Sequence, residues 1–206
     1  GRDEASLSEL ANELNSTFTS CDVLEETFSE KIVNDLKDEK VNGLAYCVGS
    51  IDLKPLKLTK KSDFMQSFNL NLVSATEIIK SLADNLKSSK GSIVLFSTVA
   101  VQQGFPNHAI VSSAKGAVEG LTLALAAEYA PNIRVNCIAP SLTNSKISNF
   151  LLKNEKMAES IAKMHPLRRI GNGEDSASVA KFLLTDESSW ITGQIFGVDG
   201  GRSSVA

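Results

Sequence analysis

Two hydroxyl groups and an amine in one stretch of the sequence could carry out chemistry. Ser97 and Thr98 end a run of β-forming residues that is typical of a buried strand. A loop with a glycine and a proline follows, and then a small-residue segment typical of a helix, which carries Lys115. Ligands of open α/β sheets bind at the carboxyl ends of strands. A hydroxyl at such an end, with an ammonium on the next helix, can form a reaction centre.

The elements that must position these groups follow from hydrophobic periodicity. The expected helices cover residues 3–14, 24–37, 62–87, 109–129 and 174–185, and the expected strands cover residues 16–21, 41–48, 93–97, 133–139 and 194–198. Strands that alternate with helices imply a parallel sheet. We therefore expect a single α/β domain over residues 1–206. The polar region 141–165 is expected to hold one or two mobile helices that form a lid over the substrate.

The composition limits the classes of partner. The chain has 206 residues, 42% of them hydrophobic and 22% charged, which is ordinary for a globular domain. Its net charge of −3 provides no basic field for nucleic acid, and its apolar runs are too short to predict a membrane span. Cys21, Cys47 and Cys137 have no metal-ligand spacing, and an odd number argues against a disulfide framework. We expect buried, reduced thiols in a cytoplasmic protein without a metal.

The stretch around Thr98 resembles the short-chain dehydrogenase/reductase family. That family has a strand ending in two serines and then Tyr-x-x-x-Lys, with the tyrosine thirteen residues after the second serine. Thr98 stands in the place of the second serine and Lys115 in that of the lysine, but Val111 replaces the tyrosine. Similar motifs occur at 134–140 and 191–201, so the resemblance extends over nearly the whole chain.

The resemblance implies a Rossmann-like, doubly wound parallel sheet in three α/β/α layers. The glycine-rich strand, turn and helix that open such a fold, roughly 30 to 40 residues, do not occur in the sequence. We expect that the sequence is a fragment of a longer product without this N-terminal strand and helix. The alternative is a truncated chain that fills the gap left in the sheet by dimerisation or by domain swapping.

The resemblance also implies a nicotinamide cofactor, either NADP or NAD. Arg2 lies where family members that favour NADP keep an arginine, which gives NADP a weak preference. The residues that would contact the cofactor are Arg2, Asp22, Val23, Gly49, Lys115, Pro140, Leu142 and Thr143. Simpler roles are open for four of them: a solvated terminal charge for Arg2, a helix cap for Asp22, a turn for Gly49 and a surface charge for Lys115.

The implied catalytic residues are Asn71, Thr98 with Ser97, and Lys115. Asn71 would hold a relay water, Thr98 would orient the substrate oxygen, and Lys115 would bind the nicotinamide ribose. Valine can neither give nor take a proton, so another group must replace the tyrosine. His108 lies one helical turn before Val111, and imidazole is an acid or base near neutral pH. The alternative for His108 is an exposed loop or cap residue.

The expected function is therefore hydride transfer between a nicotinamide and an alcohol or carbonyl compound, at a low rate without the tyrosine. Two alternatives remain open at this point. The first is a cofactor-binding pseudoenzyme, and the second is a dehydratase or isomerase that uses His108. The family resemblance implies a small-molecule substrate and a homodimer or homotetramer as the assembly.

Overall fold

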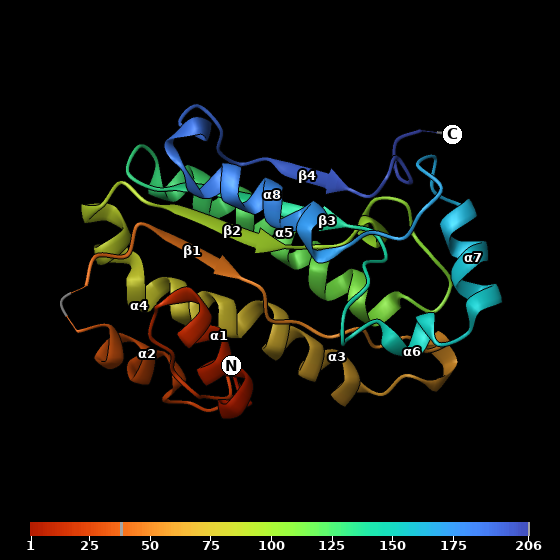
Figure 1. Cartoon of the computed structure of the whole chain (residues 1–206), viewed down its shortest axis with the longest axis horizontal. Coiled ribbons are helices and arrows are strands. Elements are labelled where there is room, and N and C mark those ends of the chain that lie inside the picture. The colour runs from red at the N-terminus through yellow and green to blue at the C-terminus, as the bar shows by residue number, and fades with distance from the viewer. Residues whose placement is uncertain (38, 206) are drawn as a thin grey trace.

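The computed structural model describes residues 1–37 and 39–205 (Figure 1). Its helices are α1 (Glu4–Leu14), α2 (Phe28–Leu36), α3 (Lys61–Phe68), α4 (Ser74–Ser88), α5 (Ala109–Tyr129), α6 (Asn149–Leu152), α7 (Glu155–Lys163) and α8 (Gly173–Leu184). Its strands are β1 (Gly43–Tyr46), β2 (Ser92–Phe96), β3 (Arg134–Pro140) and β4 (Ile195–Val198). A π-helical turn, η2 (Asn69–Val73), joins α3 to α4, and short 3-10 turns are η1 (Leu56–Leu58), η3 (Val99–Val101) and η4 (Asp186–Ser188).

The strands form one parallel sheet in the order β1-β2-β3-β4. Helices α4 and α5 cover one face of this sheet and α8 covers the other (Figure 1). The expected three-layer, Rossmann-like α/β/α architecture is confirmed. Since all four strands run in the same direction, their carboxyl ends lie along one edge of the sheet, where the loops after β1, β2 and β3 meet.

The two central strands are buried on both faces. Ile93, Val94 and Leu95 of β2 have no exposed surface, and neither has Val135 or Ile138 of β3. Strands covered by helices on both sides require apolar residues at consecutive positions, which explains the unbroken hydrophobic run before Ser97. This burial fixes the positions of the strand ends that carry the polar residues of the site.

Three expected element bounds were wrong. Residues 16–21 form no strand, since their backbone pairs with no described strand and Cys21 N–H donates instead to the Gly1 carbonyl over 2.8 Å. The expected helix 24–37 begins four residues later, after a turn. The expected helix 62–87 is divided by the π-helical turn, which the periodicity of its apolar residues did not reveal.

Helix α5 is the one described helix whose length and hydropathy would allow it to cross a membrane, contrary to the expectation from apolar run lengths. In this fold it packs on β2, β3 and η2. The expectation of three buried thiols was also partly wrong. Cys21 and Cys137 are buried, whereas Cys47 is exposed after β1; all three are free.

Candidate active site

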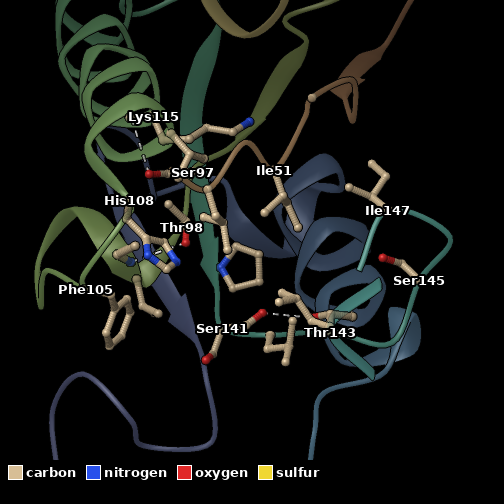
Figure 2. A pocket seen from close by; sticks show the side chains of 18 of the residues that line it. Ile51, Ser97, Thr98, Phe105, His108, Lys115, Ser141, Thr143, Ser145 and Ile147 are labelled. Atoms are coloured by element: carbon tan, nitrogen blue, oxygen red, sulfur yellow. Dashed lines mark hydrogen bonds between the residues drawn. The ribbon is translucent and has the colours of Figure 1, made fainter. Parts of the chain in front are cut away.

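A cavity of about 680 Å³ opens at the carboxyl ends of the strands (Figure 2). Its walls come from the segments that follow β1, β2 and β3, from the start of α5, and from helices α6 and α7. Thr98, His108, Val111 and Lys115 all line it. The hydroxyl and the amine singled out by the sequence therefore share one cleft.

The two hydroxyls after β2 have different roles. Ser97 is buried, and its Oγ lies 2.6 Å from Glu119 Oε1 and 3.3 Å from the Lys115 carbonyl, so it ties β2 to α5. Thr98 Oγ1 accepts the Ala100 N–H over 3.3 Å and thereby caps η3. A hydroxyl that accepts one hydrogen bond keeps its proton for another partner. Thr98 is therefore the better group to hold a substrate oxygen.

Lys115 is buried on α5, with 8% of its surface exposed, and its Nζ donates to the Phe96 carbonyl over 2.8 Å. Burial lowers the pKa of this amine to about 8. Burial likewise raises the pKa of the Cys137 thiol to about 12, so this neighbour stays neutral. The amine remains cationic at neutral pH, although its pKa lies close enough to be titrated. The surface-charge role for Lys115 is thereby excluded.

Asn71, Lys115 and Gly49 form a small polar cradle. Asn71 is 1% exposed, and its Nδ2 donates to the Ser67 carbonyl over 2.9 Å, but its Oδ1 has no hydrogen-bond partner among the described residues. A Cβ at Gly49 would lie 2.9 Å from this Oδ1 and 3.1 Å from Lys115 Nζ. An orphaned acceptor beside an ammonium and a bare backbone can receive hydroxyl groups or a water molecule. These residues fit the ribose of a nicotinamide cofactor and a bound water.

His108 lies immediately before α5 and forms part of the cavity wall. Its Nδ1 lies 2.8 Å from the Pro106 carbonyl, so in the neutral ring Nδ1 carries the proton and Nε2 is the acceptor. Its ring makes an edge contact with Phe105 at a centroid distance of 5.3 Å. Both contacts fix the orientation of the imidazole beside the cavity. Val111, one turn later, is 5% exposed and presents only methyl groups.

The other predicted cofactor residues fall into two groups. Pro140, Leu142 and Thr143 line the same cavity as Lys115. Arg2 and Asp22 lie apart from it and pair with each other over 3.3 Å, and the second carboxylate oxygen of Asp22 accepts the Leu24 N–H. That backbone bond, followed by the Arg2 contact, holds the pKa of Asp22 below its usual value. Val23, whose carbonyl accepts the Ser74 hydroxyl, belongs to this second group.

One polar pair escaped the sequence reasoning. Ser141 Oγ, on the cavity wall, lies 2.8 Å from Nε2 of His165, which is 2% exposed. The other nitrogen of His165 lies 2.8 Å from the Ile161 carbonyl, so the imidazole connects the loop after β3 to α7. The available signal was a serine where the resembled family writes glycine after Pro140, combined with one of only two histidines in the chain.

The comparison with protein families agrees with this geometry. The model described as enoyl-(acyl carrier protein) reductase matches residues 1–203. The chain belongs to the short-chain dehydrogenase/reductase family. Tropinone reductase homolog At5g06060 of Arabidopsis thaliana is 34% identical over 196 residues, which are 93% of this chain and 74% of that protein. Dehydrogenase/reductase SDR family member 4 of Sus scrofa is 40% identical over 119 residues, 57% of this chain and 43% of that protein.

Solved structures that include a short-chain type dehydrogenase/reductase have the same fold. A short-chain type dehydrogenase/reductase from Mycobacterium ulcerans is similar with a TM-score of 0.91 and 25% identity, covering 98% of this chain and 78% of that one. ElxO with NADP bound is similar with a TM-score of 0.89 and 27% identity, covering 99% of this chain and 87% of that one. Relatives at this level support a nicotinamide-dependent oxidoreductase as the general class.

Proposed function

We propose that this short-chain dehydrogenase/reductase transfers a hydride between NADP or NAD and an alcohol or carbonyl substrate. The observation that carries the proposal is that Thr98, His108 and Lys115 line one cavity at the carboxyl ends of β2 and β3 (Figure 2). When bound, the nicotinamide would supply or accept the hydride. The residues of the chain would bind, orient and protonate the reacting groups.

Thr98 and Lys115 would position the reactants. The Thr98 hydroxyl, with its proton free, would donate to the substrate oxygen and polarise the carbonyl. Lys115 Nζ and Asn71 Oδ1 would hold ribose hydroxyls and a water beside Gly49, since all three border one small space. Pro140, Leu142 and Thr143 would meet the carboxamide end of the cofactor across the same cavity.

His108 would transfer the proton that the family tyrosine transfers. Its Nδ1 is anchored to the Pro106 carbonyl, so Nε2 is the nitrogen left for a substrate. A neutral imidazole accepts a proton from an alcohol, and an imidazolium gives one to a carbonyl oxygen. We also propose Arg2, Asp22 and Val23 as contacts to the adenosine end of the cofactor. Their separation from the main cavity suits a long dinucleotide.

NADP is the cofactor we favour. ElxO was solved with NADP bound, and a tyrosine-to-phenylalanine variant of ElxO, 27% identical to this chain, was solved with NADPH bound. Arg2, which is mostly exposed, offers a guanidinium that suits a phosphate. Val111 also supports a second candidate, a protein that binds the cofactor without turnover, because its buried side chain has no titratable group.

The test is a fluorescence titration of the full-length protein with NADPH and NADH, followed by an assay for carbonyl reduction. We expect saturable NADPH binding that weakens at least tenfold in Lys115→Met and is unchanged in Lys153→Met, an exposed lid lysine. Binding with turnover supports the oxidoreductase, and binding without turnover supports the second candidate. If neither NADPH nor NADH binds, both candidate functions are wrong.

The assembly and the domain limits are also proposals. Leu123 on α5 is 53% exposed, and a Cβ at Gly120 on the same helix would meet nothing within 4 Å, so this face can approach another subunit closely. We propose a cytoplasmic homodimer or homotetramer built from one domain per chain, with residues 141–165 as the lid. Sedimentation of the wild type and Leu123→Glu tests the oligomer: a wild-type monomer would contradict it.

A further inference from the structure

Arg202 contributes a second cation to the cavity. It follows β4 in the turn after Gly201, and its guanidinium carbon lies 4.8 Å from the centre of the Phe105 ring. The side chain lines the cavity that also contains Lys115. Stacking on an aromatic face fixes the plane of a guanidinium and so directs its N–H groups.

The charge of Arg202 has no partner in the part of the chain that the structure describes. Among residues 1–37 and 39–205, no side-chain carboxylate lies within ion-pairing distance of Arg202, and no described group forms a hydrogen bond with its buried Nη1. Asp199, three residues earlier, accepts from Gly201 N–H and Ser203 N–H, both over 2.8 Å. The described cavity wall includes neither aspartate nor glutamate. Arg202 is half-buried, and a buried guanidinium nitrogen without an acceptor is costly, so an anion bound beside this nitrogen would be stabilised.

The opposite wall of the cavity is apolar. Ile147 and Met157 are each 48% exposed and Met164 is 54% exposed, although all three face the cavity. Leu151 of α6 and Ile161 of α7 complete this surface. Exposed apolar side chains gathered on the inner face of a lid indicate a ligand with an apolar body.

We propose that Arg202 binds the carboxylate of an amphipathic oxo acid, or of the corresponding hydroxy acid, whose aliphatic tail packs against the lid. This inference rests on the proposed function and specifies its substrate class. Phe105 contacts both Arg202 and His108, which places the carboxylate near the reacting carbonyl. The carbonyl carbon would take a hydride and its oxygen a proton, so a 2-oxo acid and NADPH would give a 2-hydroxy acid and NADP⁺.

Two substrates that differ in charge and by one methyl group provide the first test: 2-oxooctanoate and its methyl ester. In Arg202→Gln we expect KM for 2-oxooctanoate to rise about tenfold or more, with KM for the ester within about twofold of wild type. Lys156→Gln, which removes a charge from the exposed side of α7, should change neither value. Equal KM values for 2-oxooctanoate in the wild type and Arg202→Gln would overturn the inference while leaving carbonyl reduction in place.

A calorimetric titration separates this inference from the proposed function, because it requires no turnover. The full-length protein should bind octanoate more tightly than octanol, and Arg202→Gln should abolish the difference. Arg202-dependent octanoate binding without any carbonyl reduction would support the anionic subsite and contradict the oxidoreductase. Equal binding of octanoate and octanol by the wild type would overturn the subsite.

Discussion

Asn71 and Lys115 converge on the backbone of Gly49, although they come from different helices. The side-chain oxygen of Asn71 and the amine of Lys115 lie 2.9 Å and 3.1 Å from the point that a Cβ at Gly49 would occupy. An unpaired acceptor and a buried cation are thus held beside one open stretch of main chain.

Gly49→Ala should fill this cradle. The added methyl group would displace Asn71 Oδ1 or Lys115 Nζ, so we expect NADPH affinity to fall about tenfold or more and stability to fall by roughly 1–3 kcal/mol. Gly173→Ala is the matched control, since a Cβ there meets nothing within 4 Å at the exposed start of α8 and should stabilise the helix by up to about 1 kcal/mol. NADPH titration and urea denaturation measure both effects. Unchanged NADPH affinity in Gly49→Ala would show that the cradle holds no cofactor.

Val111→Tyr should restore a proton donor to the cavity. Val111 lines the same wall as Thr98 and Lys115, so a phenol would have a hydroxyl and an ammonium in its surroundings. We expect kcat for carbonyl reduction to rise by about 10²-fold or more, because positioned acid catalysis contributes that much. Val111→Phe adds the ring without the hydroxyl and controls for packing. Equal rates in the two variants would mean that the missing tyrosine does not limit the reaction.

His108→Gln should reduce kcat by about 10²-fold in the wild-type background and have a smaller effect in Val111→Tyr. The reason is that the imidazole would carry the proton only while no phenol is present. Asn107, the neighbouring loop residue, provides a control in Asn107→Gly, a change suited to its positive φ of 68°. Loss of an activity that needs no nicotinamide would instead identify a dehydratase or isomerase. Full reductase activity in His108→Gln would exclude the proposed role.

Lys115→Met should change how stability depends on pH. Below about pH 8 the lysine is charged in both states, and its burial penalises the folded protein by an amount that does not vary with pH. Between about 8 and 10.5 the folded protein loses the proton first, so wild-type stability rises with pH. The variant should lack this rise. Urea denaturation at pH 7 and pH 10 measures the change in unfolding free energy of each protein. An equal change in the wild type and in Lys115→Met would contradict the prediction.

The helices and central strands were predictable because their residues are locally consistent with their structure. The apolar run before Ser97 and the alternation of helices and strands identified β2, β3, α5 and the parallel sheet. The prediction of a strand at 16–21 was wrong because the composition suits a strand, yet a strand forms only when a neighbouring strand pairs with it. Local sequence carries no information about the presence of that neighbour.

The positions of site residues were predictable where the residues lie on consecutive elements that are adjacent in this fold. Thr98 and Lys115 share a cleft because a strand end and the following helix start are adjacent in this fold. Ser97 could not be separated from Thr98 by sequence, since its partner Glu119 lies 22 residues away. The His165–Ser141 contact and the Arg202–Phe105 stacking join segments distant in the chain, so only the folded structure reveals them.

The π-helical turn between α3 and α4 makes this region sensitive to length. Its extra residue allows Asn71 to face inward while α3 and α4 both keep their apolar sides on the core. Removing one residue from 69–73 would restore ordinary helical winding and rotate one flanking helix by about a quarter turn relative to the other. Sequence variation here should therefore occur by substitution, and insertions or deletions should be confined to the loops outside this segment.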